Sequence, residues 1–201
     1  KPGDPQDFQM IYLVDMEHPG LVVFPTHRLV RDLPNFDKEA VLEKCSEFFY
    51  IDEKEGTDTM EEDLKKLYDE GKKAFGFYCG KGEWFLLTLK NIDFMSQMLP
   101  NVSKASQSLD VSVLHTLILE KIFGIDKENM AKQINLTYTK FFTEAIDGVD
   151  KGEFQCSFVL NPTRVTEIRD VAAAGEKMPQ KSTYFYPKMI TGMVMNNLGV
   201  D

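Results

Sequence analysis

The stretch AFGFYCGKGEWFLLTL, residues 74–89, carries the clearest structural signal in the sequence. Two apolar runs flank the short turn sequence GKG at 80–82, and glycine readily takes the positive φ that a tight turn requires. In the second run Phe85, Leu87 and Leu89 alternate onto one face. Because no helix follows the GKG sequence, a hairpin turn is favoured over a phosphate-binding loop. The stretch therefore predicts an antiparallel hairpin.

A second hairpin is predicted closer to the N-terminus. Residues Phe8–Asp15 and Leu21–Phe24 are apolar and rich in strand formers, and the sequence His18-Pro19-Gly20 between them is typical of a turn. After Pro25 the residues 26–30 are expected to form an exposed turn or to continue the strand.

Helices are expected between and after these strands. We predict helices over residues 37–46 (capped by Asp37), 60–68, 110–123, 140–149 and 163–175, and further strands over 134–138, 154–160 and 189–195. Interleaved helices and antiparallel hairpins indicate an α+β fold, with a mixed, mainly antiparallel sheet packed against several helices. No Pro/Ser-rich linker interrupts the chain, so we expect one domain over residues 1–201.

Most of the negative charge is concentrated in one segment. Residues 52–63 contain seven acidic side chains and Lys54. The order of acidic residues lacks the pattern of a calcium-binding loop, so a solvated loop leading into a helix is favoured over a cation or partner site. Thr59 and Glu62 match a capping box, which predicts that the helix starts there.

The composition argues against several functional classes. The chain has 201 residues with 23 Lys+Arg and 32 Asp+Glu, a net charge of −9, which disfavours binding to nucleic acid through its phosphates. No apolar run approaches the roughly 20 residues of a membrane span, so no membrane partner is expected. Three cysteines without a CxxC pair favour free thiols and a cytoplasmic location. The three histidines lack metal-site spacing, so no metal held by side chains alone is predicted, and His115 is expected on an apolar helix.

The sequence GEKMPQKST at 175–183 is close to a phosphate-binding P-loop. Gln180 stands where the second glycine is required, and its Cβ would keep the backbone away from a phosphate. A helix precedes this segment and none follows it, so a true P-loop is disfavoured. Lys181 could nevertheless meet a phosphate as a point charge, with Ser182 and Thr183 as hydrogen-bond donors.

The longer segment VAAAGEKMPQKSTYFYPK, residues 171–188, resembles the closing signature of a bacterial and archaeal family, the domain of unknown function 1015 family. That signature is Met-Pro-Pro-Lys-Ser-Thr, an aromatic pair and Pro-Lys, and Gln180 replaces its second proline. Two weaker matches lie upstream, LDV at 109–111 and HRLV at 27–30, where His27 replaces an asparagine.

The resemblance implies that the chain is the C-terminal half of a longer protein, whose N-terminal half would be its first partner. That half is similar to the ParB/sulfiredoxin superfamily, which includes kinases acting on free serine. The resemblance therefore implies part of an ATP-dependent small-molecule kinase that uses ATP with Mg and is inactive as this chain alone. The phosphate or ligand contacts expected here are Arg28, His27, Lys181, Ser182, Thr183 and Lys188.

A second hypothesis involves no catalysis. The apolar faces are extensive and no acid–base pair is evident, which fits a structural, regulatory or dimerisation domain, for example a homodimer. Nucleotide binding and the solution mass distinguish the two hypotheses.

Overall fold

The computed structural model describes residues 3–4, 7–8, 11–188, 192 and 195. Residues 23–184 form one compact unit, and residues 1–22 with 185–201 form another. The strands are β1 (Val22–Phe24), β2 (His27–Val30), β3 (Phe49–Glu55), β4 (Ala74–Gly80), β5 (Glu83–Leu89), β6 (Leu136–Thr139), β7 (Cys156–Val159) and β8 (Tyr184–Tyr186). The helices are α1 (Lys38–Cys45), α2 (Met60–Asp69), α3 (Asp93–Met98), α4 (Lys104–Gln107), α5 (Asp110–Val113), the π-helix η2 (Leu114–Glu120), α6 (Lys127–Lys132), α7 (Phe142–Asp150) and α8 (Val165–Ala173).

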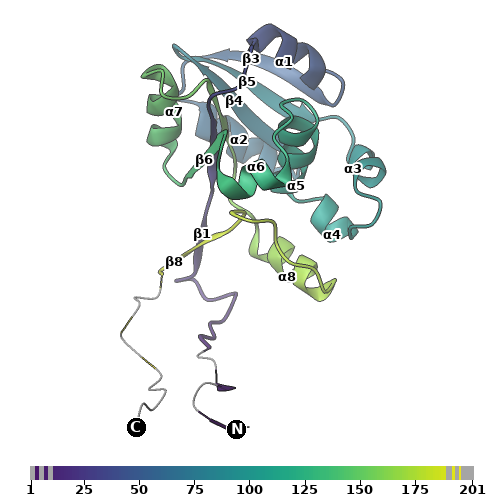
Figure 1. Cartoon of the computed structure of the whole chain (residues 1–201), viewed down its shortest axis with the longest axis vertical. Coiled ribbons are helices and arrows are strands. Elements are labelled where there is room, and N and C mark those ends of the chain that lie inside the picture. The colour runs from purple at the N-terminus through teal and green to yellow at the C-terminus, as the bar shows by residue number, and fades with distance from the viewer. Residues whose placement is uncertain (1–2, 5–6, 9–10, 189–191, 193–194, 196–201) are drawn as a thin grey trace. The chain divides into compact units, whose positions relative to one another are not determined.

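The unit formed by residues 23–184 is built on one six-stranded sheet with the order β3-β5-β4-β7-β2-β6 (Figure 1). Every neighbouring pair in it is antiparallel. The hairpin predicted at residues 74–89 is confirmed as β4 and β5, and Gly80, Lys81 and Gly82 turn between them with φ of 101°, 56° and 78°. The predicted α+β class, with a mainly antiparallel sheet packed against helices, is confirmed.

Helices cover both faces of this sheet. Because strand side chains alternate between faces, Trp84 and Leu86 point to α2 and α7, whereas Phe85 and Leu87 point to the opposite face. That opposite face is covered by α1, η2 and α6 (Figure 1). No helix in the described ranges is long and apolar enough to cross a membrane.

The N-terminal prediction was wrong in two respects. Residues 11–15 are not in a strand, and β1 pairs with β8 instead of with that segment. For residues 26–30 an exposed turn or a continuing strand was expected; the strand is confirmed as β2, but it is entirely buried between β7 and β6 and not exposed. Because β2 is hydrogen-bonded to a strand on each side, neither of its edges faces solvent, and this holds whether its residues are polar or apolar.

The acidic segment was also only partly predicted. Its first residues belong to β3, an edge strand, and not to a loop. Thr59 does precede α2, but its side chain makes no capping hydrogen bond to the backbone, so the predicted capping box is absent. β7 was expected to be half-buried and is buried on both faces, since it is a central strand. The predicted closing strand, 189–195, lies outside the described residues except for Gly192 and Met195.

Gly148 is the point of closest approach between α7 and the sheet. A Cβ added there would lie 2.9 Å from Cδ2 of Phe154 and 3.2 Å from Cδ2 of Leu29. We therefore expect Gly148→Ala to lower the free energy of unfolding by about 1–2 kcal/mol, because the strain of overpacking exceeds the helix propensity that alanine adds. Urea denaturation measures this change. Thr143→Ala, at an exposed position of the same helix, is the control and should be neutral or slightly stabilising. A Gly148→Ala variant as stable as the wild type would contradict this packing.

Candidate functional site

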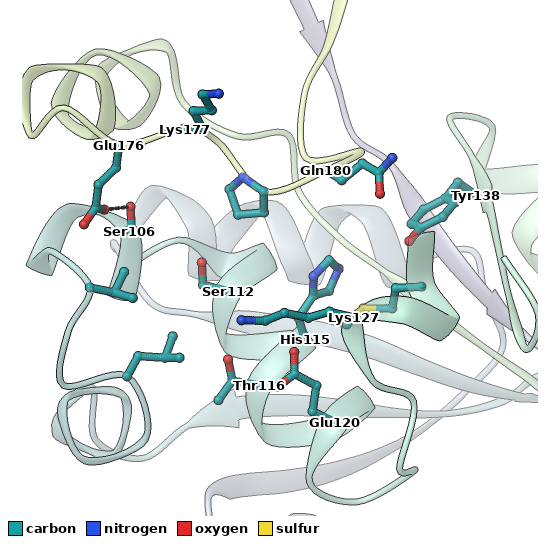
Figure 2. A pocket seen from close by; sticks show the side chains of 14 residues that line it. Ser106, Ser112, His115, Thr116, Glu120, Lys127, Tyr138, Glu176, Lys177 and Gln180 are labelled. Atoms are coloured by element: carbon teal, nitrogen blue, oxygen red, sulfur yellow. Dashed lines mark hydrogen bonds between the residues drawn. The ribbon is translucent and has the colours of Figure 1, made fainter. Parts of the chain in front are cut away.

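A cavity of about 540 Å³ lies on the η2 side of the sheet (Figure 2). Segments that are far apart in the sequence build its wall: the connection from α3 through α4, the continuous helix α5–η2, α6, β6 and the chain that follows α8. The lining residues are Leu99, Val102, Ser106, Ser112, His115, Thr116, Glu120, Lys127, Met130, Tyr138, Glu176, Lys177, Pro179 and Gln180.

The π-helix η2 gives the cavity its polar floor. The N–H of Lys121 donates to the carbonyl of Thr116 at 3.3 Å, a bond from residue i to i−5 that widens the helical turn. One side of η2 is anchored in the core by Leu114, Leu117 and Ile118. The other side presents His115, Thr116 and Glu120 to the cavity. The sequence predicted an ordinary helix here, and apolar periodicity does not distinguish the two helix types.

Arg28 lies directly behind the cavity wall. It is 1% exposed and stands opposite Tyr138 in the β2–β6 register, so that its guanidinium packs 5.5 Å from the centre of that ring. One terminal nitrogen donates to the carbonyl of Lys181 at 3.2 Å and lies 3.3 Å from Nε2 of His115. The other donates to the carbonyl of Thr26.

No carboxylate compensates this buried charge. Among the residues that the structure describes, none forms an ion pair with Arg28, and its Nε has no hydrogen-bond partner. Burial lowers the pKa of Arg28 to about 10, which leaves the guanidinium charged at neutral pH. A buried charge without a counter-charge costs several kcal/mol, so this position is receptive to an anion.

Lys73, a cation of the same unit whose side chain is 19% exposed, shows the usual arrangement. Nζ of Lys73, the residue before β4, lies 2.9 Å from Oδ1 of Asp110 and 2.8 Å from Oε1 of Glu167. These two ion pairs connect the start of β4 to α5 and to α8. Two carboxylates surround this ammonium group, whereas Arg28 has only neutral neighbours. The difference sets Arg28 apart as a candidate ligand-binding group.

Arg28 also fixes the protonation of His115. A guanidinium only donates hydrogen bonds, so Nε2 of His115 must accept and the ring proton resides on Nδ1. Burial and the nearby charge of Arg28 lower the pKa of His115 to about 3. The half-buried imidazole is therefore neutral at pH 7 and offers an N–H donor at the cavity wall.

The two glutamates of the cavity differ in their surroundings. Glu176 accepts from the backbone N–H and the hydroxyl of Ser103, at 2.8 and 2.7 Å, and from the hydroxyl of Ser106 (Figure 2). These hydrogen bonds lower the pKa of Glu176 and tie the segment after α8 to α4. The side chain of Glu120 makes no hydrogen bond or ion pair to any residue that the structure describes, and burial raises its pKa. The described residues contain no group of three or more side chains suited to hold a metal ion.

Four of the six predicted ligand contacts, Arg28 and the three residues of the segment 181–183, lie close to one another. The segment 181–183 reaches Arg28 through the carbonyl of Lys181, a residue with φ of 57° and an exposed side chain. Ser182 is 5% exposed and its Oγ is buried without a partner, while Thr183 is half-buried. Their role in ligand binding stays a prediction.

His27 does not share a site with Arg28. Because neighbouring residues of a strand face opposite sides of the sheet, His27 lines a separate cavity of about 310 Å³ beside α2. Its Nδ1 accepts from the N–H of Leu160 at 3.2 Å, and burial lowers its pKa to about 4. Lys188 belongs to the unit formed by residues 1–22 with 185–201.

Sequence analysis missed several polar residues of the large cavity. Those that matter for its chemistry are His115, Glu120, Lys127, Tyr138 and Glu176. His115 was correctly expected on an apolar helix, but its contact with Arg28 spans 87 positions of the chain. No local pattern signals such a contact.

Comparison with known proteins gives a family match and several similar folds. The model of the family "Protein of unknown function (DUF1015)" matches residues 1–112, which excludes the C-terminal signature at 171–188. No curated protein matches the chain.

Solved structures similar to this one include a conserved hypothetical protein from Pyrococcus furiosus, with 20% identity, a TM-score of 0.48, and 86% of this chain and 59% of that chain covered. A mutant of a free serine kinase in complex with ADP has 14% identity and a TM-score of 0.48, with 87% of this chain and 57% of that chain covered. A free serine kinase in complex with AMP has 16% identity and a TM-score of 0.46, with 86% of this chain and 56% of that chain covered. The chain thus spans less than two thirds of the length of these structures.

The neutral state of His115 gives a pH-dependent contribution to stability. Since its pKa in the folded chain lies below the ordinary value of 6.5, the unfolded chain binds more protons and stability falls as the pH drops from about 6.5 toward 3. Gln in place of His115 keeps an acceptor for Arg28 but cannot titrate. We expect unfolding of His115→Gln at pH 5 to take up roughly one proton less than the wild type, as measured by the slope of unfolding free energy against pH. Equal slopes would contradict a buried neutral imidazole.

Proposed function

The chain belongs to the DUF1015 family of proteins of unknown function, and from this premise we propose that its large cavity binds the phosphate groups of a nucleotide. The single observation that carries the proposal is Arg28, a buried guanidinium behind the cavity wall that has no carboxylate partner among the described residues. The wider activity that we propose is that of an ATP-dependent small-molecule kinase, with free serine as the first substrate to test.

Phosphate fits the groups available at this end of the cavity. His115 offers its Nδ1–H, Lys127 offers an ammonium group at the opening, and Arg28 adds positive potential from behind. In a site of low dielectric constant, such fixed donors and charges stabilise phosphate oxygens more strongly than water-exposed groups do. Phosphoryl transfer depends mainly on such positioning and electrostatic stabilisation.

The segment 181–183 supports the same proposal. Its backbone is bonded to Arg28, and the buried hydroxyl of Ser182 is free to donate after a small rearrangement. Lys181 and Thr183 would add a charge and a second hydroxyl when a nucleotide is bound. The only support for His27 and Lys188 as ligand contacts is the resemblance of the sequence to the family.

Magnesium would arrive with the nucleotide. Mg²⁺ commonly binds through one or two carboxylates together with substrate phosphates, and in this proposal those carboxylates belong to the rest of a longer protein. The rest of the machinery would come from the remainder of a longer protein, its N-terminal half being the partner that we propose. Free thiols at Cys45, Cys79 and Cys156 fit a reducing compartment, so we place the activity in the cytoplasm.

Replacing Arg28 separates binding from folding. We expect Arg28→Met to weaken the binding of Mg-ATP to the full chain at least tenfold, measured by calorimetry, because the positive charge behind the phosphates is lost. The same change should leave stability unchanged or raise it by roughly 1–4 kcal/mol, since a buried unpaired charge is removed.

Arg31→Met is the matched control for this experiment. Arg31 follows the same strand, but its side chain is 45% exposed and outside the cavity lining, so Mg-ATP should bind this variant as it binds the wild type. Equal affinity of Arg28→Met and the wild type for Mg-ATP would refute the proposal.

Lys181 provides an independent test of the adjoining loop. Its side chain is exposed, so Lys181→Ala should leave stability unchanged while lowering the affinity for Mg-ATP several-fold through the loss of one positive charge. If the wild type itself forms a tight dimer by light scattering and does not bind Mg-ATP, the alternative of a structural or dimerisation domain is supported instead.

A further inference from the structure

Glu120 is an uncommitted acidic group inside a cavity that we assign to an anionic ligand. It lies at the C-terminal end of η2, half-buried, and contacts no hydrogen-bond or ion-pair partner among the described residues. The other acidic group, Glu176, is already satisfied by Ser103 and Ser106. An isolated carboxylate near a phosphate would weaken the binding of a simple anion, so its presence needs a ligand that compensates it.

Lys127 brings the opposite charge to the same space. Its side chain extends from α6 across the cavity in Figure 2, while Glu120 and Thr116 rise from η2 toward it. Burial raises the pKa of Glu120 and the nearby charge of Lys127 partly opposes this, yet the ion pairs found in the described part of the chain do not include one between these two side chains. Two opposite charges that share a cavity without pairing are complementary to a ligand that carries both charges.

The π-helix sets the distance between His115 and Glu120. His115, the donor held by Arg28, and Glu120 are five residues apart, which places them about one helical turn, or roughly 5 Å, from each other along the axis. A short aliphatic linker spans such a distance. His115, which is backed by the buried Arg28, and Lys127 supply donors and positive potential to the cavity, and Glu120 supplies its uncommitted negative charge.

We infer that this cavity recognises a phosphorylated primary amine, with the phosphate against His115 and Lys127 and the ammonium group against Glu120. The inference rests on the proposed function for the phosphate end and adds a specificity-determining residue for the other end. A divalent cation at Glu120 fits less well, because Glu120 is the one uncommitted carboxylate among the described residues that line the cavity.

Two ligands that differ by a single group test the assignment. O-phosphoethanolamine and n-propyl phosphate have the same number of heavy atoms, but the first ends in an ammonium group and the second in a methyl group. Calorimetric titration of both into the full chain, in EDTA, measures the preference for the amine. We expect the wild type to bind O-phosphoethanolamine about tenfold more tightly, as a charge-assisted hydrogen bond to a partly buried carboxylate would give.

The variant Glu120→Gln should lose this preference. It should bind O-phosphoethanolamine more weakly and n-propyl phosphate equally or more tightly, because both the attraction and the repulsion are removed. Glu128→Gln is the matched control, since Glu128 is an exposed residue of α6 that pairs with Lys132, and it should keep the wild-type preference. Thermal melting of both variants checks that they remain folded.

The outcomes distinguish this inference from the proposed function. No preference for the amine in the wild type, or an undiminished preference in Glu120→Gln, overturns the inference alone. A preference that appears only when Mg²⁺ replaces EDTA assigns Glu120 to a metal and also overturns it. If Mg-ATP binds and neither phosphate ester does, the inference fails while the proposed function stands. If none of the three ligands binds, both fail.

Discussion

The site depends on a single charged side chain held within the sheet. Arg28 is on β2, between β7 and β6, and the antiparallel register decides that its guanidinium lies beside Tyr138 and under η2. Its remaining neighbours come from His115 and from the backbone after α8, so segments separated by up to 153 positions meet at one group. Moving β2 by one residue would send Arg28 to the α2 face and dismantle this arrangement.

Two cations of residues 23–184, the buried Arg28 and the partly buried Lys73, show how the cost of removing a charge from water is met in different ways. Lys73 is compensated by Asp110 and Glu167 from two helices, and it thereby fastens those helices to the sheet. Arg28 is surrounded by carbonyls, an imidazole and an aromatic ring, which orient it without cancelling its charge. The first arrangement stabilises structure, whereas the second keeps a positive potential available at a cavity.

Local sequence patterns predicted the elements whose residues also contact one another locally. Three elements were predicted because the residues that form their turns and ends are neighbours in the sequence. They are the hairpin at residues 74–89, the helix capped by Asp37 and the helix before Gly175. β3 was missed because an edge strand tolerates charged residues. Residues 11–15 were overrated because apolar strand formers do not make a sheet without a partner strand. Burial of β2 and β7 follows from strand order, which no single stretch encodes.

The candidate site was predicted only in part, because its contacts also join residues that are far apart in the sequence. Arg28 and the segment 181–183 were singled out by residue type and resemblance, and the structure places them in contact. His27 was grouped with Arg28 because they are adjacent in sequence, although adjacency in a strand puts them on opposite faces. Glu120 and Lys127 gave no signal at all, since a charged residue on a helix is ordinarily a solvated one.

The charged edge of the sheet has a bearing on how copies of this chain would meet. An unpaired strand edge is a template for adding a strand from another molecule, and β3 presents this edge with Asp52, Glu53 and Glu55 along it. Two copies that approached through β3 would align like charges, so extension of the sheet from copy to copy is opposed there. The acidity that was expected to belong to a solvated loop thus protects this edge against strand addition, and any biological dimer would be expected to form through another surface.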